Sequence, residues 1–173
     1  MFTNQSYLTK TAEALRKNDI NPEQFIEDVC KIIGNNEPHI KALIPEKNRY
    51  QRLLEEVREL KSQYPDPDKR PPLFGIPVGI KDIIHTKGFE TKAGSNLPAH
   101  IFKGKEASLV QKLKDAGAII LGKTVTTEFA YFEPGETRNP HNTEHTPGGS
   151  SSGSAAAVSS GFTPLAIGTQ TIG

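Results

Sequence analysis

The sequence predicts an α/β fold in which helices cross over between the strands of a sheet. Two observations support this prediction. After residue 72, short runs rich in β-branched and other apolar residues alternate with segments of helical spacing, and this alternation is typical of strands joined by crossover helices. The chain of 173 residues is also 35% hydrophobic and 24% charged, which are the proportions of a globular protein with a real core.

Residues 1–68 are predicted to form an N-terminal helical segment. Within it, residues 8–34 have the spacing of two short helices, and Asn21 followed by proline is a typical start for the second one. We expect that helix to end at Gly34, because glycine often follows the last helical turn. Residues 45–64 are predicted to form a longer amphipathic helix, since their apolar residues recur on one face.

Residues 69–173 are predicted to form the first part of an α/β domain. The stretch PDPDKRPP at 65–72 breaks the helical periodicity, and prolines of this density mark a boundary. The elements expected beyond it are strands at 75–84, 118–123 and 164–169, and helices at 105–117 and 152–161.

Composition excludes several classes of protein. The formal net charge is +1, so no overall field would attract nucleic acid or an anionic membrane. The N-terminus, MFTNQSYLTK, has no apolar core of signal-peptide length, and no apolar run in the chain approaches a membrane span. The single cysteine, Cys30, cannot form an internal disulfide. We therefore expect a cytoplasmic protein that binds neither nucleic acid directly nor a membrane.

Two short patterns match ligand-binding motifs but are predicted not to bind those ligands. GAIILGKT at 117–124 satisfies the phosphate-loop pattern, yet its apolar middle predicts a buried strand where that motif needs an open loop. HNTEH at 141–145 satisfies a zinc-protease pattern, yet prolines on both sides leave no room for the helix that would bring both histidines to one ion. We therefore expect no metal site and no cofactor.

The residues that suggest chemistry are a lysine and a loop. Lys81 lies in the apolar run PLFGIPVGIKDII, where burial would favour the neutral amine, which is a base. The loop at 148–154, GGSSSGS, leads directly into an alanine-rich helix, an arrangement that brings backbone N–H groups and hydroxyls close to a ligand. A serine hydroxyl within reach of a neutral lysine would make a base-activated relay.

From residue 72 to residue 173 the chain resembles the amidase signature family. The resemblance rests on PLFGIPVGIKDIIHTKGFETKAGS, GAIILGKTVTTEFA, RNPHNTEHTPGGSSSGSAAAVSSG and PLAIGTQTIG, which agree in order and spacing. It implies a mixed sheet flanked by helices, of which this chain would supply an incomplete part. It also implies hydrolysis of a carboxylic amide by a triad of lysine, cis-serine and nucleophilic serine, without metal or cofactor.

The resemblance assigns roles to particular residues. Lys81 stands at the position of the family lysine and Ser150 at that of the cis-serine. The motif that carries the nucleophile reads GTQTIG here, so the nucleophile is expected to follow Gly173 directly. The oxyanion hole is implied at the backbone N–H groups of Thr171, Ile172 and Gly173, and the supporting loop at Gly148, Gly149, Ser151 and Ser152.

Three interpretations besides a free amidase stay open at this point. Gln170 replaces the aspartate usual in the A subunits of glutamyl-tRNA amidotransferases and so favours a free amidase, but that branch is retained. A non-catalytic remnant is the second interpretation, and a nucleotide-binding module is the third and least favoured. The chain as given is expected to be an inactive fragment. Its expected partners are a small-molecule amide, and either the C-terminal part of the fold or further copies in a homo-oligomer.

Overall fold

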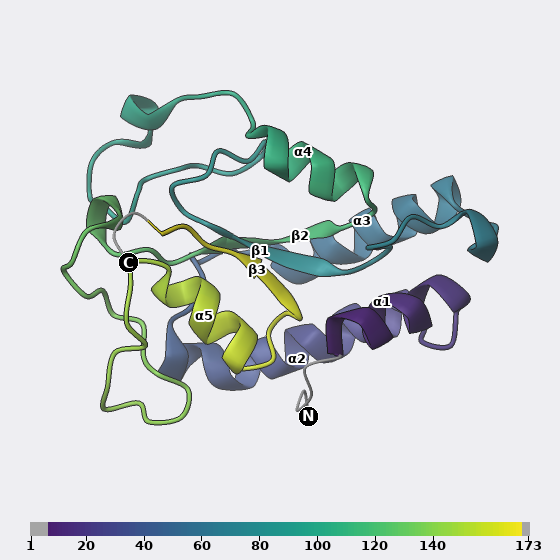
Figure 1. The fold of residues 1–173 in the computed structure, drawn as a ribbon, viewed down its shortest axis with the longest axis horizontal. Coiled ribbons are helices and arrows are strands. Elements are labelled where there is room, and N and C mark those ends of the chain that lie inside the picture. Colours follow the sequence, from purple (N-terminus) through teal and green to yellow (C-terminus); the bar gives the residue numbers. More distant parts are fainter. Residues whose placement is uncertain (1–6, 171–173) are drawn as a thin grey trace.

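The computed structural model describes residues 7–170, and its centre is a three-stranded sheet (Figure 1). The strands are β1 Pro77–Lys81, β2 Ile119–Thr124 and β3 Leu165–Ile167. They lie in the order β2-β1-β3, and both pairings are parallel. The expected α/β fold, with a sheet flanked by helices, is confirmed, and β1 is the central strand.

Two helices form the crossovers that parallel strands require. Helix α4, Ser108–Asp115, lies between β1 and β2 in the sequence, and helix α5, Ser152–Ser159, lies between β2 and β3. Figure 1 shows α4 on one side of the sheet and α5 on the other. Because both strand pairings are parallel, the carboxyl ends of all three strands meet at one edge of the sheet, where the chain enters α5.

Among the described residues, three helices precede the sheet, and three short 3-10 segments lie in the connections. The helices are α1 Tyr7–Lys17, α2 Pro22–Ile40 and α3 Arg49–Gln63, and the 3-10 segments are η1 Pro67–Lys69, η2 Ala99–Phe102 and η3 Glu128–Ala130. The predicted start of α2 is confirmed. Asn21 Oδ1 accepts the N–H groups of Glu23 at 2.9 Å and Gln24 at 3.4 Å, which satisfies donors that the first helical turn leaves unpaired.

The prediction that α2 ends at Gly34 is wrong. Gly34 does not adopt the left-handed conformation that closes a helix, and α2 continues for six more residues to Ile40, which is buried in the core. The helix ends instead at Lys41, whose φ is 54°. The carboxylate of Glu37 stabilises this end by accepting the N–H of Leu43 at 2.7 Å, a tertiary contact that glycine spacing does not reveal.

One apolar core joins the N-terminal helices to the sheet. Its fully buried members include Ile26 and Val29 of α2, Leu53 and Val57 of α3, and Val78, Ile80 and Leu121 of the sheet. The domain boundary after residue 68 stays a prediction. Within residues 7–170, no helix combines the length and apolar character needed to cross a membrane.

Candidate active site

Lys81 is the last residue of β1 and its side chain is fully buried. Its Nζ lies 2.6 Å from Ser150 Oγ and 2.8 Å from Thr169 Oγ1. Burial lowers the pKa of Lys81 below its ordinary value of 10.5, because the charged ammonium loses its hydration. The central strand thus places a lysine whose neutral form is favoured by burial next to two hydroxyl groups.

Ser150 is held by a loop that is hydrogen-bonded to the segment after β2. The peptide bond between Gly149 and Ser150 is cis, as the family resemblance implies. The Ser150 carbonyl accepts the Thr127 N–H at 3.1 Å and the Thr126 hydroxyl at 3.2 Å. Gly149 must be a glycine at this packing distance, since a Cβ there would lie 2.8 Å from Thr127 Cγ2. The loop is a built part of the fold and not a flexible linker.

Helix α5 begins directly after this loop and is tightly packed at its first turn. The Gly153 N–H donates to the Val125 carbonyl at 2.9 Å, and a Cβ on Gly153 would overlap the Ala42 carbonyl. Ser154 is buried and its hydroxyl contacts Thr124 Oγ1 at 2.6 Å. Ser152 is also buried and donates to the Val125 carbonyl at 3.4 Å. These contacts fix α5 against the end of β2.

Ser151 connects this loop to the segment after β3. Its hydroxyl donates to the Thr169 carbonyl at 3.1 Å and accepts the Thr169 N–H at 3.0 Å. Because Ser151 adjoins Ser150, one loop positions both hydroxyl partners of Lys81. The sequence did not identify Thr169 as a site residue, although it lies in the motif GTQTIG. Its contact with Lys81 joins residues that are 88 positions apart, so no local sequence pattern reveals it.

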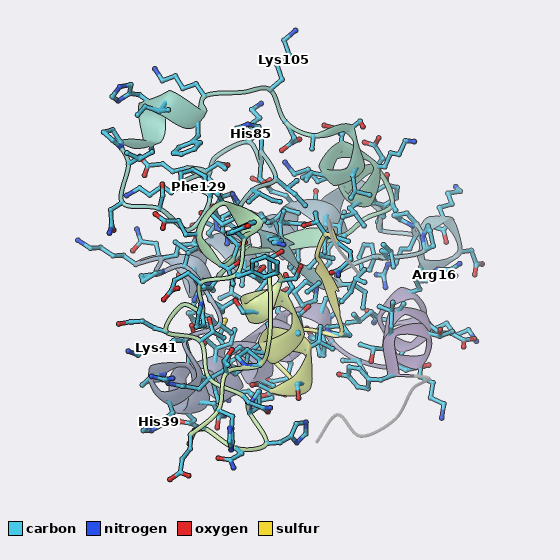
Figure 2. The ribbon with its side chains drawn as sticks, turned by 60° about the vertical axis from the view of Figure 1, so that its left-hand side comes forward. Arg16, His39, Lys41, His85, Lys105 and Phe129 are labelled. Atoms are coloured by element: carbon cyan, nitrogen blue, oxygen red, sulfur yellow. The ribbon has the colours of Figure 1, made fainter. Side chains whose placement is uncertain are left out.

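A pocket of about 360 Å³ opens beside Ser150. Gly149, Ser150 and Thr127 line part of it. An aromatic wall, defined as Phe129, Tyr131 and Phe132, lines another part and is exposed. The label in Figure 2 locates Phe129 in the connection that follows β2. The pocket therefore places apolar surface next to the lysine-linked hydroxyl.

The segment that resembles a phosphate loop is a buried strand, as predicted. Ile119 to Thr124 form β2, and every residue of this strand is buried. Lys123 Nζ lies 2.7 Å from Asp82 Oδ1 and 3.0 Å from Thr91 Oγ1. Burial lowers the pKa of Lys123, and the Asp82 carboxylate opposes that shift. This lysine serves an internal ion pair and is not available to phosphate.

The segment that resembles a zinc site is a series of turns. Asn139 Oδ1 accepts the His141 N–H at 2.9 Å, and the His145 N–H donates to the Asn142 carbonyl at 3.0 Å. The two histidines are not on a helix. In the part of the chain that the structure describes, no three His, Cys, Asp or Glu residues are grouped to hold a metal ion. His39 and His85 lie far apart (Figure 2).

The structure brings together some of the residues implied by the family resemblance and leaves others outside its range. Lys81, Ser150 and the loop residues Gly148, Gly149, Ser151 and Ser152 lie within or beside the hydrogen-bonded cluster. The residues implied for the oxyanion hole, Thr171, Ile172 and Gly173, lie outside the described residues. Their role stays a prediction.

Comparison with known proteins gives consistent matches. A family model for amidases matches residues 24–173. The A subunit of the glutamyl-tRNA(Gln) amidotransferase of Natranaerobius thermophilus is 39% identical over 172 residues, which cover 96% of this chain and 35% of that protein. The structure of native peptide amidase from Stenotrophomonas maltophilia has a TM-score of 0.82 at 30% identity and covers 96% of this chain and 36% of its own.

A third match is the structure of 6-aminohexanoate cyclic dimer hydrolase complexed with substrate. Its TM-score is 0.74 at 28% identity, and the match covers 92% of this chain and 33% of that one. The chain described above thus spans about a third of the length of the proteins that it matches.

Proposed function

Because the chain belongs to the amidase signature family, we propose that the complete protein hydrolyses a carboxylic amide with Lys81 and Ser150 as two members of a serine, cis-serine and lysine triad. The observation that carries the proposal is the 2.6 Å contact between Lys81 Nζ and Ser150 Oγ at the end of a buried strand. The third member is the serine that the family resemblance predicts directly after Gly173.

In the proposed reaction, neutral Lys81 accepts a proton from Ser150 while Ser150 accepts one from the nucleophilic serine. The nucleophile attacks the amide carbonyl, and an acyl-enzyme forms as the C–N bond breaks. Ser150 then returns a proton to the leaving ammonia or amine. Water removes the acyl group by the same relay in reverse. The lowered pKa of Lys81 supports this scheme, since the base must be neutral to begin it.

Stabilisation of the developing oxyanion is proposed for the backbone N–H groups of residues 171–173. Donors of this kind act where negative charge appears in the transition state. Gly148, Gly149, Ser151 and Ser152 are proposed as the supporting loop, because their segment fixes Ser150 against Thr126 and Thr127. The relay needs no metal and no cofactor.

The pocket beside Ser150 supports a preference for amides that carry an apolar substituent. The aromatic wall of Phe129, Tyr131 and Phe132 offers a surface that a hydrocarbon or aryl group would bury. Peptide amidase, one of the similar solved structures, acts by its name on peptide amides. A panel of aliphatic, aryl and peptide amides is therefore the appropriate first screen.

A second candidate is the amide-hydrolysing component of a glutamyl-tRNA amidotransferase. The identity of 39% to the A subunit of such an enzyme favours it, whereas Gln170 argues for a free amidase. The two candidates differ in what they require. A free amidase hydrolyses small amides alone, while the amidotransferase component would release ammonia from an amide donor only with its partner chains present.

The test begins with the mass of the protein as its source cells make it, with peptide sequencing past Gly173. A serine at the next position supports the triad. A chain that ends at Gly173 contradicts it and directs attention to a non-catalytic role. Amide hydrolysis by the complete protein is then measured as ammonia release, with Lys81→Ala and Ser150→Ala compared with the exposed controls Lys105→Ala and Ser62→Ala.

Loss of either triad member is expected to reduce kcat by about 10²–10⁴-fold, the usual contribution of a positioned acid or base. The two control variants should keep the wild-type rate, because their side chains face solvent. Wild-type rates in Lys81→Ala and Ser150→Ala would refute the triad. Ammonia release that depends wholly on added partner chains would favour the second candidate.

A further inference from the structure

Lys81 has a second hydrogen-bond partner that the triad scheme does not use. Thr169 Oγ1 lies 2.8 Å from Lys81 Nζ, and Ser150 Oγ lies 2.6 Å from the same atom. The lysine side chain is fully buried. Within residues 7–170, these two hydroxyls are the hydrogen-bond partners of the nitrogen.

The two protonation states of Lys81 would use these hydroxyl partners differently. An ammonium has three N–H donors and no acceptor, whereas the neutral amine has two N–H donors and one lone pair. If one N–H of Lys81 donates to Thr169, the lone pair can accept the O–H of Ser150. If the amine instead gave its N–H to Ser150 and its lone pair to Thr169, it could not accept the Ser150 proton. Lys81 Nζ is the donor to Thr169 Oγ1, and this direction leaves the lone pair of the neutral amine free to accept the Ser150 proton.

Thr169 is itself fixed in place at both its backbone polar groups. Its N–H donates to Ser151 Oγ at 3.0 Å, and its carbonyl accepts the Ser151 hydroxyl at 3.1 Å. Gly168 allows this approach, since a Cβ there would lie 2.7 Å from Ser151 Oγ. The position of the Thr169 hydroxyl thus depends on the same loop that holds Ser150.

We propose that Thr169 is a positioning residue for the amide hydrolysis proposed above, on which this inference rests. Its hydroxyl accepts an N–H of Lys81 and so directs the lone pair of the amine at Ser150. Ser151 holds Thr169 in register with Ser150, so that the base and the hydroxyl it deprotonates are aligned before substrate binds. Alignment of this kind supplies part of the rate by removing unproductive orientations.

The electrostatic surroundings leave this role to hydroxyl groups. Lys123 of β2 adjoins Thr124, the register partner of Lys81, so its side chain lies on the opposite face of the sheet from Lys81, where it pairs with Asp82, the residue after β1. Helix α5, strand β3 and the loop at 148–151 contain no charged residue. Within residues 7–170, the contacts of the Lys81 amine are hydrogen bonds to two hydroxyl groups, and these orient it.

The first experiment compares Thr169→Val with Thr169→Ser in the complete protein. Valine keeps the branched shape and lacks the hydroxyl, whereas serine keeps the hydroxyl and lacks the methyl group. Thr169→Val is expected to lower kcat by about 10-fold to 10²-fold, the scale of a misaligned catalytic group, with KM unchanged. Thr169→Ser is expected to stay within about threefold of the wild-type rate, as orientation is restored.

A second readout does not depend on finding a substrate. The complete protein is labelled with ¹³C at lysine Cε, and the titration of Lys81 is followed by NMR in wild type and both variants, with Lys81→Met to assign the signal. Loss of an acceptor destabilises the ammonium, so Thr169→Val is expected to lower the pKa of Lys81. Thr169→Ser is expected to restore the wild-type titration.

The outcomes separate this inference from the proposed function. If no amide is hydrolysed, the proposed function fails, and the titration alone decides whether Thr169 holds the amine. An unchanged Lys81 titration in Thr169→Val overturns the inference, as does a wild-type kcat in that variant. A serine variant as impaired as the valine variant also overturns it, since a purely structural role would depend on shape and not on the hydroxyl.

Discussion

Breaking the buried ion pair between Lys123 and Asp82 is predicted to cause a large loss in the free energy of unfolding. The side chains are 2% and 4% exposed, and their charged atoms lie 2.7 Å apart. Lys123→Met removes the cation and leaves a buried carboxylate, whose other oxygen accepts the Lys92 N–H at 3.1 Å. Breaking a buried pair by removing one partner costs about 3–5 kcal/mol. Since native domains are stable by about 5–15 kcal/mol, this is a large fraction of the total.

The assay is chemical denaturation followed by circular dichroism. The matched control is Lys17→Met, which breaks the ion pair of Lys17 with Glu13, whose side chains are 63% and 56% exposed. Ion pairs this exposed contribute little to stability, because solvent screens them, so the control should leave the free energy of unfolding almost unchanged. Asp82→Asn combined with Lys123→Met removes both charges, and we expect it to recover about 0.5–3 kcal/mol relative to the sum of the single changes.

A loss of unfolding free energy for Lys123→Met no larger than that for Lys17→Met would contradict this prediction, because the buried pair would then contribute no more than the exposed one. A melting-temperature increase with magnesium and ATP in wild type, absent in Lys123→Met, would contradict the assignment of this lysine to an internal role and restore the phosphate-loop interpretation.

Three further outcomes are expected. The rate of the proposed reaction should rise with pH through a midpoint below 10.5, since burial lowers the pKa of Lys81 from that value and the neutral amine is the base; a midpoint at or above 10.5 in a pH–rate profile contradicts this. The melting temperature of wild type should rise relative to that of Lys81→Met as the pH rises to 10.5. A lysine pKa that is lowered in the folded state destabilises the protein below the unfolded-state pKa, and this cost disappears as the pH reaches that value. A wild-type melting temperature that falls relative to that of Lys81→Met contradicts the lowered pKa. Gly153→Ala should lose about 1–3 kcal/mol on denaturation, because its Cβ overlaps the Ala42 carbonyl, while the exposed control Ala155→Ser should lose only about 0.5 kcal/mol.

The elements that sequence predicted well are those with a local cause. The three strands and the helices of the sheet region follow from apolar periodicity, and the Asn21 cap follows from a side chain that bonds its own helix. The end of α2 was missed because its cause is tertiary. The buried Ile40 and the carboxylate of Glu37 extend the helix past Gly34, and neither contact can be inferred from spacing.

The candidate site was predicted unevenly for a similar reason. Lys81 and Ser150 were named because a family motif contains each of them, and the structure brings their side chains together across 69 residues of sequence. Thr169 and the pairing of Lys123 with Asp82 were missed, because each depends on two segments far apart in the chain. Local pattern indicates which residues are unusual, but packing decides which of them meet.

The central position of β1 has a consequence for the order in which the protein assembles. Lys81 emerges during synthesis 69 residues before Ser150 and 88 residues before Thr169. Contacts that close such long loops form slowly. An amine desolvated before those hydroxyls arrive would lack hydrogen-bond partners, which is costly. We therefore expect the side chain of Lys81 to remain hydrated until the segment that contains Thr169 docks beside Ser150, so that the docking of this segment is the step that creates the base.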